Sequence, residues 1–362
     1  MSELKFTMTA RCEAAGRPNN EDNFQLTDNL TDDQWSFVTG REVTLGEKGA
    51  LMAVCDGMGG MNAGATASGL AIKTIKEWFA SGRLTIQTIS SQLSVMQYIE
   101  QAIIAADCTI KEMGKENKEM AGMGSTIVLA WIVGSNVYVG WCGDSRAYRF
   151  NPSSGLERLS HDHSYVQELV DSGKLSKDLA FDHPDNNIIT RSLGDNRQTV
   201  MPDVNSFVLS NNDIILLCSD GLHGVLRDNE IESILSDNAD SPENCRNALW
   251  DASGKAGWTD NVTITICRIV SGIENSELSS QNTNNEHDKQ NVQAAKTLIP
   301  EITPGYTKVR KRKPNVLIIT LIILFLSVIV FEVWHYLSKG EWWSIKEFQD
   351  LIKQISTIIH QS

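Results

Sequence analysis

The chain has 362 residues, enough for one large domain with appended segments, and 41% of them are hydrophobic, enough for a full core. Its net charge of −13 argues against a nucleic-acid partner. Acidic groups gathered around divalent cations fit this charge, and so does a solvated acidic surface. The cysteines are scattered and odd in number, without a C-x-x-C pair, which indicates a reducing compartment. The N-terminus lacks the apolar core of a signal peptide.

Residues 1–270 are predicted to form one folded unit. Apolar runs between polar turns predict strands, in chain order, at 6–12, 51–55, 125–133, 136–142, 147–150, 213–218 and 261–270. Helical spacing predicts helices at 63–79, 95–113, 165–172 and 243–255, with a loop or hairpin at 28–48. Because many strands are spaced as hairpins, we expect an α+β fold of antiparallel sheets packed against helices.

The stretch 51–64, LMAVCDGMGGMNAG, carries the first candidate site. Asp56 ends a predicted buried strand, and the glycines after it let the backbone approach an ion or a phosphate closely. The alternative is a strand-to-helix turn that Asp56 caps. The metal site is favoured because other strand ends are acidic as well.

Those other acidic positions are Glu21 and Asp22 in a polar turn, Asp144 in GDSR, Asp220 after IILLCS, and Asp260 before the last strand. Carboxylates at strand ends can converge on one edge of a sheet and hold a hard divalent cation. Since no His or Cys cluster suits zinc, oxygen ligands alone predict Mg²⁺ or Mn²⁺. A single aspartate at such a position is usually a turn or cap residue. This alternative is much weaker for all of these acidic residues together.

At these residues the chain resembles the metal-dependent protein phosphatases of type 2C, the PPM family, in their bacterial form. The resemblance covers one domain, residues 7–268, and leaves out the C-terminal segment. It is carried by segments in the family's order: GRPNNED, VCDGMGGMNAG, GMGSTIVLA, CGDSRAYR, DHSYVQELVDSG, NIITRSLG, CSDGL and DNVTI. It implies a four-layer α-β-β-α sandwich, in which helices flank two antiparallel sheets.

The resemblance also implies the metal ligands. Asp56 would bridge two Mn²⁺ or Mg²⁺ ions, the Gly57 carbonyl would bind one of them, and Asp220 and Asp260 would hold the other. Asp144, together with Asp220, would serve a weaker third ion.

The remaining implied roles concern water and substrate. Glu21 and Asp22 would order metal-bound waters, and Arg17 would grip the substrate phosphate. Two metal ions lower the pKa of a shared water, and the resulting hydroxide attacks phosphorus in line, without a phosphoenzyme. Arg17 and Asp56 are therefore the expected catalytic residues.

Met58 departs from the animal relatives, which carry a histidine after the central Asp-Gly. Methionine cannot protonate a leaving alkoxide, so the general acid stays open between a metal-bound water and His163. A structural hydrogen-bonding role is the alternative for His163. Residues 165–190 match the mobile flap beside the family's active site.

After residue 270 the composition turns to Ser, Asn, Gln and Glu, which predicts a disordered linker over 271–315. Residues 316–337 are long and apolar enough to cross a membrane as one helix, with a buried core helix as the alternative. The cations before this span place residues 1–313 in the cytoplasm; they are Lys308, Arg310, Lys311, Arg312 and Lys313. The amphipathic tail, 338–362, is expected to lie on the outer membrane surface, or else to meet a partner helix.

The leading hypothesis is a single-pass serine/threonine phosphatase of the cytoplasmic membrane that opposes a bacterial kinase. Its expected partners are phosphorylated proteins, among them a kinase or its targets, and membrane lipid, with no nucleic acid. A membrane-anchored pseudophosphatase that only binds phosphoproteins is the first alternative, disfavoured by the presence of Asp56, Asp220 and Asp260. A receptor that senses through its tail is the second, disfavoured because so short a tail lacks a core.

Overall fold

The structure is a computed structural model that describes residues 3–31, 35–60, 63–80 and 82–273. The chain divides into two compact units, Met1–Gln281 and Asn282–Ser362, and all described residues belong to the first. Nearly the whole predicted linker, the predicted span 316–337 and the tail 338–362 lie outside the described residues.

Two antiparallel sheets form the centre of the first unit. The first has the order β3-β1-β12-β11-β8-β9, with β1 (Lys5–Glu13), β3 (Val43–Thr44), β8 (Arg146–Asn151), β9 (Gly155–Arg158), β11 (Ile214–Cys218) and β12 (Val262–Ser271). The second has the order β10-β7-β6-β4-β2, with β2 (Asp22–Thr27), β4 (Ala50–Met58), β6 (Ile127–Val133), β7 (Asn136–Cys142) and β10 (Asp203–Val208). The short β5 (Gly124–Ser125) pairs with the end of β4.

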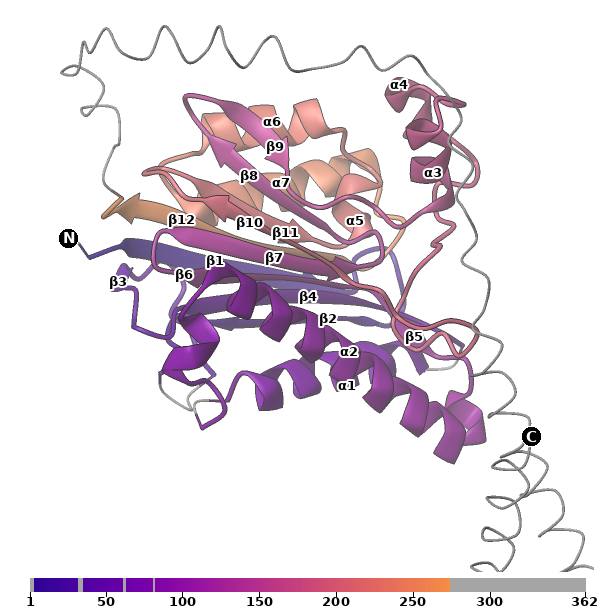
Figure 1. Ribbon diagram of the computed structural model, residues 1–362. Helices are drawn as coiled ribbons and strands as arrows, with labels where there is room; N and C mark the ends of the chain where they lie inside the picture. Colours follow the sequence, from indigo (N-terminus) through magenta and orange to yellow (C-terminus); the bar gives the residue numbers. More distant parts are fainter. Residues whose placement is uncertain (1–2, 32–34, 61–62, 81, 274–362) are drawn as a thin grey trace, which may run out of the picture. The chain divides into compact units, whose positions relative to one another are not determined.

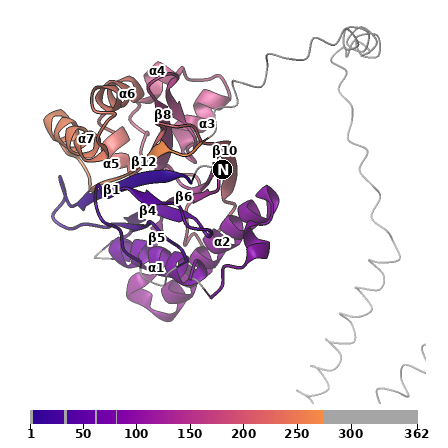
Figure 2. The same cartoon turned by 90° about the vertical axis from the view of Figure 1, so that its left-hand side faces the viewer.

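Helices cover the outer face of each sheet, which gives four layers (Figures 1 and 2). The second sheet is covered by α1 (Ala63–Trp78) and α2 (Gln92–Glu116), and the first by α5 (Asp220–His223), α6 (Asp228–Asp237) and α7 (Pro242–Ala256). The segment between β9 and β10 holds α3 (Tyr165–Asp171) and α4 (Lys177–Ala180). Two 3-10 helices, η1 (Ile86–Ile89) and η2 (Lys118–Met120), flank α2. The predicted α+β sandwich of antiparallel sheets and helices is confirmed.

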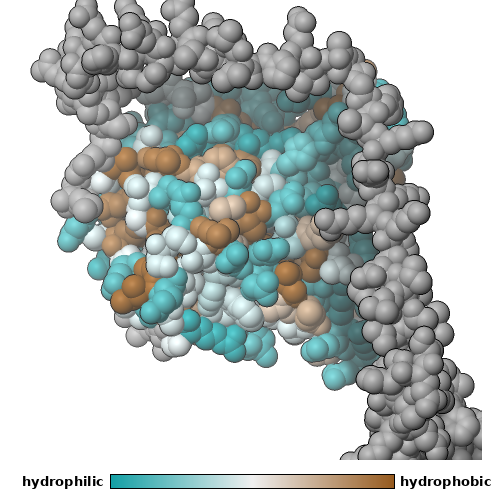
Figure 3. All heavy atoms as spheres, in the orientation of Figure 1, coloured by the Kyte–Doolittle hydropathy of each residue, from teal (hydrophilic) through white to brown (hydrophobic). Residues whose placement is uncertain are grey.

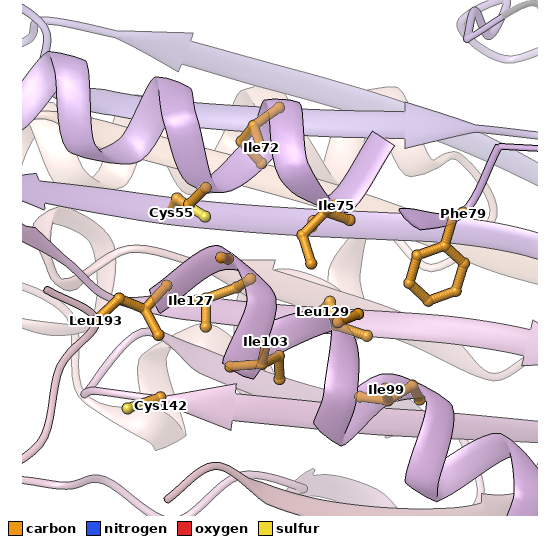
Figure 4. Close-up of a cluster of buried hydrophobic side chains, with 14 of the residues drawn as sticks. Cys55, Ile72, Ile75, Phe79, Ile99, Ile103, Ile127, Leu129, Cys142 and Leu193 are labelled. Atoms are coloured by element: carbon orange, nitrogen blue, oxygen red, sulfur yellow. The ribbon is translucent and has the colours of Figure 1, made fainter. Parts of the chain in front are cut away.

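Strand β4 shows why the sequence builds these layers. Its residues 50–55 are fully buried, so its apolar run is continuous rather than alternating. Alternate side chains still point to opposite faces: Leu51, Ala53 and Cys55 pack against the helices, whereas Ala50, Met52 and Val54 face the other sheet. Figure 4 shows the helix side, where Cys55 lies among isoleucines of α1 and α2.

Some elements were not predicted, and each has a weak apolar signal. Strand β10 has no fully buried residue, and α6 has only Ile231 and Leu235 buried. Strand β2 and the short α4 and β9 were missed for the same reason. The predicted strand 51–55 in fact continues to Met58, because β5 pairs with its end.

The outer surface mixes polar and apolar side chains. On the face shown in Figure 3, apolar groups of the described residues lie in separate patches among hydrophilic ones. No helix of the described residues is long and apolar enough to cross a membrane. The predicted span 316–337 lies outside these residues.

Candidate active site

The predicted carboxylates gather where strands of both sheets end. Asp22 begins β2 and lies opposite Asp56 in the register of β2 and β4. Asp220 begins α5, two residues after the end of β11 at Cys218, and Asp144 lies in the turn between β7 and β8. Asp56 is part of a strand rather than the cap of a helix, so the turn-and-cap alternative for this residue is wrong.

Asp22 joins the two sheets. Its buried carboxylate accepts hydrogen bonds at Oδ2 from the hydroxyls of Ser219 and Thr263, each at 2.7 Å. Its other oxygen, Oδ1, has no hydrogen-bond partner among the described residues. Burial raises the pKa of Asp22 to about 7, although the two hydroxyl hydrogen bonds lower it in part.

The pKa values of the neighbouring carboxylates are raised as well. Burial, and then the charges of Asp220, Asp22 and Asp144, raise the pKa of Asp56 well above its usual range. Burial and the charge of Asp220 do the same for the pKa of Asp144, and burial and the charge of Asp260 raise the pKa of Asp220. These carboxylates therefore repel one another in a poorly hydrated place.

This donor set suits a hard divalent cation. Oδ1 of Asp144 and Oδ1 of Asp220 are buried and lack a hydrogen-bond partner among the described residues, as Oδ1 of Asp22 does. Carboxylate oxygens are the ligands that Mg²⁺ and Mn²⁺ prefer. No three Asp, Glu, His or Cys side chains of the described ranges already surround one point as metal ligands do.

Arg17 and Asp260, predicted to bind phosphate and metal respectively, bind each other. Arg17 Nε lies 3.1 Å from Asp260 Oδ1, and a terminal nitrogen of the guanidinium lies 2.7 Å from Oδ2. Both carboxylate oxygens are thus engaged by one guanidinium. Because the two side chains are 54% and 36% exposed, solvent weakens this pair and a ligand can compete with it.

Gly57 and Glu21 lie side by side at the start of α1. Glu21 accepts at its backbone carbonyl from the Gly57 amide at 3.2 Å and from the Ser68 hydroxyl at 2.6 Å. A Cβ at Gly57 would lie 2.1 Å from the carbonyl oxygen of Gly64, so only glycine fits this close approach. The Glu21 carboxylate also lies against Gly64, where a Cβ would be 2.7 Å from Oε2.

Asn261 is a supporting residue that the sequence reading missed. Its side-chain amide donates to the carbonyls of Ala14 and Asn19 at 2.9 and 2.8 Å, and its Oδ1 accepts from the Glu21 amide at 2.8 Å. Asn261 therefore fixes the loop that carries Arg17 and Glu21 beside Asp260. The only signal in the sequence was a polar residue between Asp260 and the last strand.

His163 supports the turn that carries Asp144. Its Nδ1 accepts from the Gly143 amide at 3.2 Å, its Nε2 lies 3.2 Å from Asp203, and its ring stacks on Trp141. Burial lowers the pKa of His163, and only 4% of the residue is exposed. These contacts agree with the structural role and leave no free edge for protonating a leaving group.

A cavity of about 1,100 Å³ adjoins the carboxylates. Arg17, Asp144, Asp220 and Asp260 line one part of it. The segment 165–190, which was expected to form a flap, contributes residues such as Lys177 and Phe181 to the opposite part. The carboxylates predicted to bind metal and the guanidinium predicted to bind phosphate thus line one cavity large enough for a peptide side chain.

Residues 19–262 match the family described as Protein phosphatase 2C. The chain belongs to the protein phosphatase 2C family. It is similar to the serine/threonine phosphatase stp of Listeria welshimeri, with 32% identity over 222 residues, which cover 60% of this chain and 83% of that protein.

Solved structures agree with this assignment. A bacterial serine phosphatase has a TM-score of 0.62 and 30% identity, covering 74% of this chain and 99% of its own. The catalytic domain of the phosphatase PstP, solved with 2 manganese ions, has a TM-score of 0.58 and 25% identity, covering 74% of this chain and 100% of its own. The chain is a protein serine/threonine phosphatase, and dependence on Mn²⁺ or Mg²⁺ is general to its family.

The raised pKa of Asp22 predicts how the metal-free phosphatase responds to pH. A carboxyl whose pKa is raised by folding favours the folded state when protonated, so its contribution is full below about pH 4 and is lost as pH rises to about 7. In EDTA at pH 7.5, Asp22→Asn should raise the free energy of unfolding by up to about 4 kcal/mol, with little difference near pH 4. Urea unfolding across this pH range measures the effect.

Asp213→Asn is the matched control. Asp213 precedes β11, whereas the site lies at the other end of that strand, and burial also raises the pKa of Asp213. Mn²⁺ should change the difference in free energy of unfolding between the Asp22 variant and the wild type. It should not change the same difference for the Asp213 variant. Equal responses to Mn²⁺ would remove Asp22 from the metal site.

The Arg17–Asp260 pair predicts an effect on metal affinity. Removing Arg17 frees Oδ2 of Asp260, leaves Oδ1 bonded only to the Asn261 amide, and takes a positive charge from the cluster, so Arg17→Ala should bind Mn²⁺ about fivefold more tightly. Titration calorimetry on the chain stripped of metal measures this. Arg17→Lys keeps the charge, so its affinity for Mn²⁺ should lie between those of the wild type and Arg17→Ala. Weaker Mn²⁺ binding by Arg17→Ala would contradict a competition between Arg17 and the metal for Asp260.

Proposed function

We propose that the chain hydrolyses phosphoserine and phosphothreonine in proteins at this carboxylate cluster, with Mn²⁺ or Mg²⁺. The observation that carries the proposal is the convergence of buried aspartates with unpartnered oxygens on a cavity that also holds Arg17. The family supports the reaction class, and the shared cavity of Arg17, Asp144, Asp220 and Asp260 supports the choice of residues.

The ions would be held by Asp56, the Gly57 carbonyl, Asp220 and Asp260, with Asp144 as a ligand of a weaker third ion. When bound, they supply Lewis acidity and activate water at neutral pH. Glu21 and Asp22 flank these ligands and would order water beside them. The hydroxyls of Ser219 and Thr263 keep the Asp22 carboxylate oriented between the sheets.

Arg17 would bind the substrate phosphate. Its guanidinium is half-exposed at the cavity and is held in plane by the Asp260 carboxylate. A guanidinium fork matches two phosphoryl oxygens and neutralises the charge that they carry through the reaction. Phosphate and Asp260 are thus alternative partners for the same donors of Arg17.

We further propose that residues 316–337 anchor the phosphatase in the cytoplasmic membrane, with residues 1–270 in the cytoplasm. The support comes from the sequence: an apolar run of spanning length, the basic run before it, and the polar tether 271–315. Such a tether lets the domain reach phosphoproteins near the membrane, where it would oppose a serine/threonine kinase.

Removing one acidic ligand tests the reaction. Asp56→Asn or Asp220→Asn should lower turnover of a phosphothreonine peptide by at least about a hundredfold, because a ligand charge is lost. Arg17→Ala should act mainly on KM. Steady-state kinetics with Mn²⁺ and with EDTA measure these effects. Asp237→Asn, an exposed aspartate at the end of α6, is the control and should match the wild type. Full activity in EDTA would overturn the metal requirement.

Cysteine labelling tests the anchor. In intact cells, a membrane-impermeant thiol reagent should modify a cysteine placed at Ser362 and spare one placed at Ser280. The expected reason is that the basic run keeps its side of the span in the cytoplasm. The opposite pattern would reverse the orientation, and labelling of both positions would exclude the anchor.

A further inference from the structure

A second hollow lies between the end of α7 and Trp258. It has a volume of about 320 Å³ and is lined by Trp250, Asp251, Gly254, Lys255 and Trp258. The catalytic cavity is lined by the next two residues of the chain, Thr259 and Asp260. The two hollows are therefore lined by consecutive residues of the chain.

Trp258 is 38% exposed and yet rigidly held. Its indole Nε1 donates to the Ser253 hydroxyl at 3.0 Å, and that hydroxyl donates to the Trp250 carbonyl at 2.8 Å. Its ring lies 5.0 Å from the buried ring of Trp250. A Cβ at Gly254 would come within 2.8 Å of the Trp258 ring, so a glycine in α7 is what lets the indole lie flat against that helix.

The backbone of Trp258 is tied to the phosphate-binding loop. A Cβ at Gly16 would lie 2.3 Å from the Trp258 carbonyl oxygen, and the Gly16 amide donates to the Asp260 carbonyl at 3.2 Å. Arg17 follows directly and pairs with Asp260. The position of the Trp258 ring relative to the phosphate-binding group is thus fixed before any substrate arrives.

We propose that this hollow binds a large apolar side chain of the substrate, close in sequence to the phosphorylated residue. The inference rests on the proposed function, which places the phosphate at Arg17. An extended peptide advances roughly 3.3 Å per residue, so a nearby residue can reach across the Trp258–Thr259 peptide. A rigid, half-exposed tryptophan binds such a side chain with little loss of conformational entropy.

The chemistry of the walls favours an apolar occupant over a charged one. Two tryptophans and a glycine are among the five residues that line the hollow, although Trp250 is 4% exposed and the Arg11 guanidinium lies 3.8 Å from its ring centroid. Asp251 and Lys255 lie four residues apart on α7 and carry opposite charges, so the hollow has no net charge. The mechanism uses none of these side chains.

A set of phosphothreonine peptides tests the proposal. All other residues are alanine, and one leucine is placed in turn at each of the three positions on either side of the phosphothreonine. One position should lower KM by roughly tenfold relative to all-alanine, the range expected for a buried hot-spot contact. Trp258→Ala should abolish this preference, and Trp258→Phe should keep part of it. Ile86→Ala, an exposed apolar residue of η1, should change nothing. p-Nitrophenyl phosphate is too small to span both hollows. The activity of each variant on peptides is therefore expressed relative to its activity on p-nitrophenyl phosphate.

Lys255→Glu gives a second readout that does not depend on the tryptophan. It makes the hollow acidic, so the preferred residue at the same peptide position should change from leucine to arginine. No leucine preference in the wild type, or a preference that survives in Trp258→Ala, would overturn the proposal. Failure of the wild type to hydrolyse any phosphopeptide would instead overturn the proposed function.

Discussion

Repulsion between carboxylates that the fold forces together is the constraint on which this structure depends. Aspartates from strand ends of both sheets lie close enough for their charges to raise one another's pKa, and burial adds to the effect. Such an arrangement opposes folding, so the surrounding structure must outweigh it. The fully buried strand β4 and the hydroxyl hydrogen bonds on Asp22 provide that support. A bound cation would remove this repulsion, so the site proposed above would recover in metal affinity the stability that it costs the metal-free fold.

Much of the fold could be predicted because apolar periodicity is strong where it matters. The runs that became β4, β6, β7, β11 and β12 are buried throughout or nearly so, and each was recognised. The half-buried edge strand β10 and the short α6 lack that signal, since their packing depends on neighbours distant in the sequence. Propensity alone cannot supply those neighbours.

The site, too, has a part that the sequence predicts and a part that it does not. Asp56, Asp144 and Asp220 could be chosen because each follows an apolar run, a local pattern. The contact between Arg17 and Asp260 joins residues at opposite ends of the domain, and so do the three hydrogen bonds of Asn261. Pairings across such sequence separations are set by the strand order, which a single sequence does not display.

The central place of β12 has a consequence for synthesis of the protein. This last strand lies between β1 and β11, and Asp260, Asn261 and Thr263 at its start hold Arg17, Glu21 and Asp22 in place. A nascent chain that has emerged only as far as β11 contains Asp22, Asp56 and Asp144 but lacks the residues that fix the N-terminal loop. The candidate site is therefore complete only once the last strand of the domain has been synthesised, and a chain that ends before it lacks Asp260 and the contacts of Asn261 and Thr263.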